Sequence, residues 1–372
     1  MTDWPVKTLG DVATIATGKI DVNAATENGE YPFFTCSRDV YRIDDAPFEG
    51  KAILVAGNGD LNVKYYEGRF NAYQRTYFLF ARDENKCYPR YLFWFLENYL
   101  DVLRSGASGS TIKYIRLGDL SEASIAVPPL EEQKRIVALL DTATERVTEL
   151  TACYEQARTH ANNLFASALR DALESNPDWP VKTLGDISEI AYGYTESAKN
   201  EEVGPKFLRI TDIKDRGVNW DEVPFCPIDT EQLKRHRLED GDIVFARTGA
   251  TTGKSFLVID PPLAVCASYL IRLRIDKKMV SPDFLNLNFQ TTGYWKQVND
   301  GMSGAAQGGF NATKLGLLEI PVPSLAEQKK IVVQLDSMRA KTSEMVAAYD
   351  AKLTAAKNLR QSILEAAFAG DL

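Results

Sequence analysis

The chain has 372 residues, of which 45% are hydrophobic and 25% charged, a composition typical of a folded protein with room for two domains. No apolar run reaches the roughly 18–20 residues that a membrane span needs, and the amino-terminal residues do not have the pattern of a secretion signal. The cysteines are scattered without C-x-x-C spacing: Cys36, Cys87, Cys153, Cys226 and Cys266. This distribution excludes a disulfide scaffold or a cysteine-rich zinc site and fits a reducing cytoplasm.

Taken alone, the net charge of −8 argues against nucleic-acid binding, because phosphate contacts need clustered lysine and arginine. The two halves do not differ in this respect. Residues 1–128 contain 14 basic and 17 acidic side chains, and residues 176–323 contain 17 and 20. Any DNA contact is therefore expected in local loops, together with a more basic partner.

An internal repeat organises the chain. The sequence DWPVKTLGD occurs at residues 3–11 and again, unchanged, at residues 178–186, an offset of 175. PPLEEQKRIV at residues 128–137 matches PSLAEQKKIV at residues 323–332, an offset of 195. The segment between these two motifs is thus about 20 residues longer in the second copy. A duplication with a variable middle and a fixed end explains the pattern.

The variable middles have the pattern of mixed α/β domains. Four β-rich runs lie between Gly, Asn and Asp residues: 52–56, 76–81, 242–246 and 268–275. Each copy then has one stretch with helical apolar spacing, at residues 89–104 and 282–298. The aromatic residues in these stretches are expected in the core rather than as platforms for stacked bases. A Gly/Ser-rich loop follows each stretch, at residues 105–113 and 303–314.

The fixed ends have the pattern of two long helices, without an internal Pro or Gly. Apolar residues recur with heptad spacing, which predicts a seam along which the two helices pair. The predicted seam residues are Ile136, Leu140, Val147, Leu150, Ile331, Leu335, Met338, Met345, Leu359 and Ile363. The alternative is that each helix packs only on its own globular domain. Pairing is favoured because the two seams are equally long and in phase.

A catalytic site is not indicated. His160 and His236 stand apart from any nucleophile or metal-ligand cluster. The sequence GATTGKS at residues 249–255 resembles a phosphate-binding loop but is one residue short of that motif. Asp212-Ile213-Lys214 matches only the end of a nuclease motif, and no Asn-Pro-Pro-aromatic methyltransferase motif is present. The sequence predicts no catalytic residue, bound metal or cofactor in this chain.

Loops at matching places in both copies suit DNA contact instead. They combine glycine, which lets the backbone approach phosphates, with Arg, Lys, Asn, Gln and Thr, which can bond phosphates or base edges. The alternative for any one loop is an ordinary glycine-rich turn. The candidates in the first copy are Arg38, Asn58, Asn62, Lys64, Gln74, Arg75, Ser110, Thr111 and Lys113. Those in the second copy are Arg209, Thr211, Lys214, Arg247, Thr248, Thr251, Thr252, Lys254, Gln307, Asn311 and Lys314.

Together these motifs resemble the specificity subunits of type I restriction-modification systems. The resemblance covers nearly the whole chain and depends on the two W-P-x-K-x-L-G-D starts, the two E-Q-K-[RK]-I-V helix openings at Glu132 and Glu327, and the carboxy-terminal sequence. It implies an α+β protein with a first target recognition domain at 1–128, a central spacer helix at 129–175, a second recognition domain at 176–323 and a second spacer helix at 324–372. The two helices would form an antiparallel coiled coil.

The resemblance also implies a function and partners. Each recognition domain would read half of a split, asymmetric sequence in double-stranded DNA, and the helices would set the gap. Two modification subunits would carry S-adenosylmethionine and methylate adenine N6, and restriction subunits using ATP and Mg²⁺ would join through them in the cytoplasm. The alternatives are a stand-alone DNA methyltransferase or nuclease with a degenerate site, and a coiled-coil scaffold that binds proteins.

Overall fold

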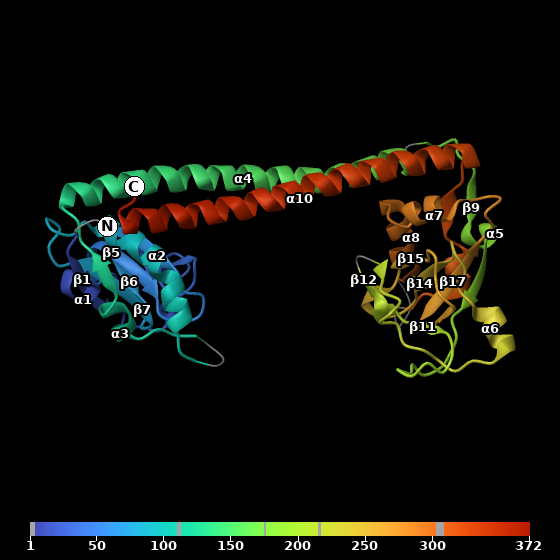
Figure 1. Ribbon diagram of the computed structural model, residues 1–372, viewed down its shortest axis with the longest axis horizontal. Helices are drawn as coiled ribbons and strands as arrows, with labels where there is room; N and C mark the ends of the chain where they lie inside the picture. The colour runs from blue at the N-terminus through green and yellow to red at the C-terminus, as the bar shows by residue number, and fades with distance from the viewer. Residues whose placement is uncertain (1–3, 110–112, 175, 215–216, 303–308) are drawn as a thin grey trace. The chain divides into compact units, whose positions relative to one another are not determined.

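The computed structural model describes residues 4–109, 113–174, 176–214, 217–302 and 309–372 (Figure 1). The chain folds as two compact units. Unit 1 comprises residues 1–156 and 349–372, and unit 2 comprises residues 157–348. Unit 1 is therefore built from both ends of the chain. No helix in the described ranges is long and apolar enough to span a membrane.

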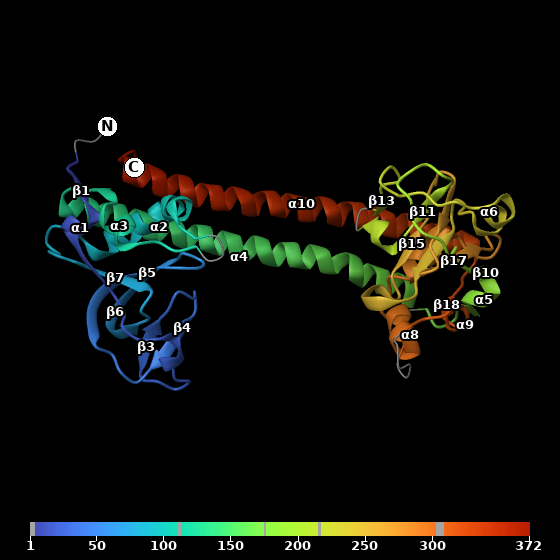
Figure 2. The same cartoon turned by 90° about the horizontal axis from the view of Figure 1, so that it is seen from below.

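Unit 1 is built on a six-stranded mixed sheet with helix α2 against it (Figure 2). The strand order is β2 (Ala13–Thr17), β7 (Thr76–Ala81), β5 (Phe48–Ala56), β6 (Val63–Ala72), β3 (Tyr31–Phe34) and β4 (Val40–Ile43). The helices are α1 (Leu9–Val12), α2 (Pro89–Gly106) and α3 (Leu117–Ser121). Strands β1 (Val6–Thr8) and β8 (Ser124–Ala126) form a separate antiparallel pair.

Unit 2 repeats this plan with a four-stranded antiparallel sheet. Its strand order is β10 (Ser188–Tyr192), β17 (Leu270–Ile275), β14 (Ile243–Ala246) and β15 (Ser255–Leu257). Three two-stranded pairs are β11 (Lys206–Leu208) with β16 (Ala264–Cys266), β12 (Ile213–Lys214) with β13 (Gly217–Val218), and β9 (Val181–Thr183) with β18 (Glu319–Pro321). The short helices are α5 (Leu184–Ile187), α6 (Thr230–His236), α7 (Pro282–Asn288), α8 (Thr292–Met302) and α9 (Ala312–Gly316).

One predicted helix is wrong in extent. The apolar spacing of residues 282–298 predicts a single helix, but the structure has α7 and α8 with a break between them. Asn288 and Thr291 bond nearby backbone carbonyls through their side chains, at 2.8 Å each. Such bonds offer the chain an alternative to the helical ladder and favour a turn. In unit 1 the corresponding stretch has no such break and forms α2.

The repeated DWPVKTLGD motif forms a strand followed by a capped helical turn. The Thr8 hydroxyl accepts a bond from the Asp11 backbone N–H at 3.2 Å, and the Asp11 carboxylate accepts one from the Thr8 N–H at 3.1 Å. This reciprocal capping box recurs at Thr183 and Asp186 in unit 2. The bond from Thr8 lowers the pKa of Asp11, and the bond from Thr183 lowers that of Asp186. The unchanged residues therefore specify the same local structure twice.

The glutamine of each E-Q-K motif ties the long helix to its own unit. Gln133 is fully buried; its side-chain oxygen accepts a bond from the Tyr88 N–H, and its nitrogen donates to the carbonyls of Lys86 and Pro128, all at 2.8 Å. Gln328 makes the equivalent three bonds in unit 2. Because a buried amide is costly when unpaired, this residue fixes where each long helix leaves its domain.

The long helices α4 (Leu130–Glu174) and α10 (Leu325–Ala369) pair within each unit, in opposite chain directions. In unit 1 the start of α4 packs against the end of α10 (Figure 1). Ile136 and Leu140 share a core with Leu364 and Ala367. In unit 2 the end of α4 packs against the start of α10 in the same way. The predicted antiparallel pairing is confirmed, and the alternative of helices that pack only on their own domains is excluded.

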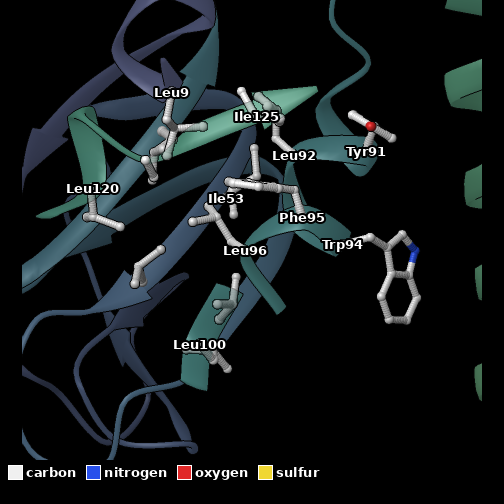
Figure 3. Close-up of a cluster of buried hydrophobic side chains, with 14 of the residues drawn as sticks. Leu9, Ile53, Tyr91, Leu92, Trp94, Phe95, Leu96, Leu100, Leu120 and Ile125 are labelled. Atoms are coloured by element: carbon white, nitrogen blue, oxygen red, sulfur yellow. The ribbon is translucent and has the colours of Figure 1, made fainter. Parts of the chain in front are cut away.

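The core of unit 1 lies between the sheet and α2 (Figure 3). Ile53 from β5 faces Leu92 and Leu96 from α2, and Ile125 closes the cluster from β8. Trp94 points away from these residues in Figure 3, and its indole N–H donates to the Asp141 carboxylate of α4 at 2.8 Å. Helix α2 thus links the sheet on one side to α4 on the other. Its aromatic residues lie in or against the core, as predicted.

The predicted seam is correct in part. Ile136, Leu140, Val147, Ile331 and Leu335 are buried, and Met338 and Ile363 are half-buried. Leu150, Met345 and Leu359 are exposed, which contradicts their assignment to the seam. Near the end of α10 the buried residues are Ala356, Leu364 and Ala367. Ala356 and Ala367 are eleven residues apart, which is not a multiple of the seven-residue heptad. A straight helix has 3.6 residues per turn, so its buried positions drift out of a strict heptad.

This shift predicts unequal effects of two leucine substitutions on α10. Leu364→Ala should lower the free energy of unfolding by about 2–4 kcal/mol, because it leaves a cavity in the core of unit 1. Leu359→Ala, the matched control at a 50% exposed position, should change it by less than about 0.5 kcal/mol. Urea unfolding followed by tryptophan fluorescence measures both. Equal effects would contradict the observed seam.

Candidate nucleic-acid interface

In unit 1, four segments that are distant in the sequence meet where β3 and β5 end and where β6 and β7 begin. The Gly57 N–H donates to the Arg75 carbonyl at 2.9 Å, and the Ile115 N–H donates to the Gly57 carbonyl at 3.0 Å. The Cys36 thiol donates to the same Arg75 carbonyl at 3.3 Å. We call this set, residues 36–38, 57–64, 73–76 and 113–115, the first rim.

Unit 2 contains an equivalent set of segments. The Arg247 N–H donates to the Tyr269 carbonyl at 3.2 Å, and the Phe310 N–H donates to the Arg247 carbonyl at 2.9 Å. The Ala267 N–H bonds the Leu208 carbonyl at 2.9 Å, which brings Arg209 to the same place. We call residues 209–212, 247–254, 267–270 and 309–314 the second rim.

The two rims share a backbone frame and differ in side chains. Gly57 and Arg247 follow equivalent strands, β5 and β14. The N–H of each donates to the turn that precedes the neighbouring strand of its sheet, β7 in unit 1 and β17 in unit 2. The receiving residues are Arg75 in the first rim and Tyr269 in the second. Backbone hydrogen bonds fix the frame, so the side chains can vary without changing it.

Two predicted contacts of the first rim bond within the protein. Asn62 is buried, and its side chain donates to the carbonyls of Cys36 and Asp60 at 3.0 and 2.9 Å. Lys64 bonds the Asn62 side chain and donates to the Ser37 carbonyl at 2.6 Å. Burial lowers the pKa of the Lys64 amine. These two residues hold the loop in shape.

The other candidates of the first rim face outward. Gln74, Arg75 and Lys113 are exposed, and Asn58 is half-buried beside Tyr114. Arg38 is exposed and forms an ion pair with Asp60 at 2.7 Å. An exposed ion pair is worth little in water, so the Arg38 guanidinium remains available to a stronger anion. The first rim therefore presents cations and amides on a fixed backbone.

In the second rim, Arg247 stacks on an aromatic ring and pairs with no carboxylate among the described residues. Its guanidinium carbon lies 4.8 Å from the centre of the Tyr192 ring, and its Nη1 donates to the Ser268 carbonyl at 3.4 Å. The Tyr192 hydroxyl accepts a bond from the Ala312 N–H at 3.1 Å, which fixes the ring. Stacking on an aromatic face orients the planar guanidinium and leaves its edge for a partner.

The glycine-rich loop of unit 2 is a hairpin turn. It joins the antiparallel strands β14 and β15, whereas a phosphate-binding loop leads from a strand into a helix. Thr251 and Thr252 bond the carbonyls of Thr248 and Gly249 within the turn, and Lys254 is exposed. The loop therefore does not have the structure of a nucleotide site, in agreement with the one-residue mismatch in its sequence.

The remaining candidates of unit 2 have mixed surroundings. Arg209 forms a two-bond pair with Asp212, at 2.7 and 3.0 Å, which raises the pKa of Arg209. Lys214 pairs with Glu222 at 3.1 Å at an exposed position. Three further candidates are Thr211, which is exposed, Asn311, which caps α9, and Lys314, which bonds the Gly301 carbonyl. Ser110, Thr111 and Gln307 lie outside the described residues.

Sequence reasoning missed two tyrosines, Tyr269 in the second rim and Tyr192 at the end of β10 beside it. Tyr192 holds Arg247, and Tyr269 is 64% exposed at the turn. A signal was present in the repeat, because Tyr192 takes the position of Thr17 at the 175-residue offset. Aligning the two copies and marking the positions that differ at strand ends would have found it.

The chemistry that the rims offer is hydrogen bonding and positive charge. Within the described ranges, no three His, Cys, Asp or Glu side chains are placed to hold a metal ion. The rims contain guanidinium, ammonium, amide and hydroxyl groups, which bond phosphate oxygens and base edges. These groups have the chemistry that contacts to DNA require.

The family model of the type I restriction modification DNA specificity domain matches residues 1–157 and 176–355. The chain belongs to this family. The EcoDI specificity subunit of Escherichia coli, a type I restriction enzyme subunit, is 27% identical over all of this chain and 89% of its own length. The MjaVIII specificity subunit of Methanocaldococcus jannaschii is 23% identical over 90% of this chain and 86% of its own length.

Solved structures share the fold. A chain from a study of complex assembly and conformational transition of the type I restriction-modification system has a TM-score of 0.77 at 20% identity, covering 99% of this chain and 98% of that one. The HsdS subunit of Thermoanaerobacter tengcongensis has a TM-score of 0.62 at 21% identity, covering 99% and 97%. The family therefore keeps this architecture while its sequences diverge.

The surroundings of Asn62 and Gln74 predict opposite effects of alanine substitution. Asn62→Ala removes a buried amide that bonds the carbonyls of Cys36 and Asp60 and the Lys64 amine. It should lower the free energy of unfolding by about 1–3 kcal/mol. Gln74→Ala removes an exposed side chain and should change stability by less than about 0.5 kcal/mol, while it weakens binding to DNA. Thermal unfolding and DNA binding by the assembled complex measure the two effects. A stable Asn62 variant that binds DNA poorly would reverse the assignment.

Proposed function

We propose that this chain is the DNA specificity subunit of a type I restriction-modification complex. Each unit reads one half of a bipartite, asymmetric site, and the paired helices set the gap between the halves. The observation that supports this most directly is the pair of rims, which share a backbone frame and differ in side chains. Family membership supports the same conclusion.

The proposal assigns the catalytic chemistry to partner subunits. This chain is then non-catalytic and directs adenine-N6 methylation and restriction by the proteins it binds. S-adenosylmethionine, ATP and Mg²⁺ bind those partners. Two modification subunits bind this chain, and restriction subunits join the complex through them. The internal repeat supports the number two, because both units contain the same DWPVKTLGD segment and the same capped turn.

Exchange of one recognition unit tests whether each unit reads its own half of the site. Residues 176–323 are replaced by the corresponding segment of a relative with a different specificity, and methylated sites are sequenced in cells with and without the chimaera. One half of the site should change and the other should stay, because each rim is built within its own unit. If both halves change, or if methylation does not depend on this chain, the proposed function is wrong.

Lengthening both long helices tests the spacing role. Seven residues added to α4 and to α10 extend each helix by about 10.5 Å, which corresponds to roughly three base pairs of DNA. The gap should grow by that amount while both half-sites keep their sequences, as it does for readers whose half-site spacing is geometric. Insertion into α4 alone is the control and should abolish methylation. An unchanged gap in the double insertion would contradict the spacing role.

A further inference from the structure

We propose that each rim reads a guanine with the arginine of one equivalent backbone bond of its frame, Arg75 in unit 1 and Arg247 in unit 2. This inference depends on the proposed function and adds to it the base that each half-site must contain. It comes from the backbone bond that joins the strand end to the turn in each rim.

Each of these bonds joins one arginine to a residue of another type. In the first rim, Gly57 donates to Arg75; in the second, Arg247 donates to Tyr269. The arginine thus comes from opposite members of the pair in the two units. A Cβ atom at Gly57 would lie 2.3 Å from the Arg75 carbonyl oxygen, so the strand-end position of the first rim has no room for a side chain. There, the arginine must come from the turn.

Arg75 has a fixed backbone and an unoccupied guanidinium. Its carbonyl accepts bonds from the Gly57 N–H and the Cys36 thiol, which hold the turn. Its side chain is exposed and bonds no other side chain among the residues that the structure describes. The planar fork is therefore presented from a rigid base, which reduces the entropy lost when it binds a ligand.

The Arg247 guanidinium is held in place by stacking on an aromatic ring. The Tyr192 ring supports one face of the guanidinium, and Nη1 makes a single long bond of 3.4 Å to the Ser268 carbonyl. Its Nε atom is buried and has no hydrogen-bond partner among the described residues. Its Nη2 forms no hydrogen bond with a described residue, so Nη2 and the second N–H of Nη1 can donate to a partner.

Guanine is the base that matches such an edge. In the major groove it presents two acceptors, O6 and N7, which a guanidinium can bond at once. Adenine presents an acceptor beside a donor, and the donor opposes a second guanidinium N–H. A phosphate also accepts two bonds from arginine, but it would confer affinity without sequence preference. The two outcomes differ in experiment.

The test uses the full-length chain in cells that hold its partner subunits, with sequencing of methylated sites. In Arg75→Ala, one guanine position in one half-site should become degenerate, with roughly 10- to 100-fold less discrimination against other bases. In Arg247→Ala the same should occur in the other half-site. Arg75→Lys and Arg247→Lys keep the charge and should retain methylation while they lose part of the discrimination. Arg170→Ala, an exposed arginine on α4 outside both rims, is the matched control and should leave the site unchanged.

Three results would overturn the inference. One is a wild-type half-site that contains no guanine. Another is an Arg75→Ala variant, at an exposed and therefore tolerant position, that keeps the wild-type sequence preference. The third is equal loss of methylation at all sites with unchanged sequence, which identifies a phosphate contact. A wild-type chain on which methylation does not depend would instead refute the proposed function.

Discussion

The structure depends on the packing of the end of the chain against its beginning. Leu364 and Ala367, near the carboxy terminus, lie in the core of the unit that the first residues build, beside Ile136 and Leu140. Neither α4 nor α10 could hold its apolar residues in water alone, because an isolated helix of this kind has no partner for them. The core of unit 1 is therefore completed by the end of α10, and the core of unit 2 by the end of α4. In both units the two helices run in opposite directions.

This arrangement separates what is constant from what varies. The residues that are identical in the two copies form capping boxes and the start of each long helix, and Gln133 and Gln328 anchor those helices through three hydrogen bonds each. The residues that differ lie at the rims, where the frame is held by backbone groups. A protein that reads two different sequences needs this separation, because new side chains must not disturb the fold.

The candidate site was predictable in position more than in detail. Loops with Gly, Arg, Asn and Thr at matching places in both copies located the rims, and residues from four distant segments do meet there. The sequence did not show the role of each single residue. Asn62 and Lys64 have the chemistry of DNA contacts and instead bond each other and nearby carbonyls. Tyr192 has no polar motif around it and yet holds Arg247.

The sequence by itself determined the repeat, the long helices and the family, because unchanged motifs and apolar spacing are local properties of the chain. It also located four strands, β5, β7, β14 and β17, for the same reason, and left the other strands unassigned. Only the tertiary structure decided which helix positions are buried, since small departures from a heptad accumulate along α10 and leave Leu359 exposed where Leu364 is covered. It also decided which cations of the rims are free, because hydrogen bonds between distant segments depend on the folded backbone and leave no local trace in the sequence.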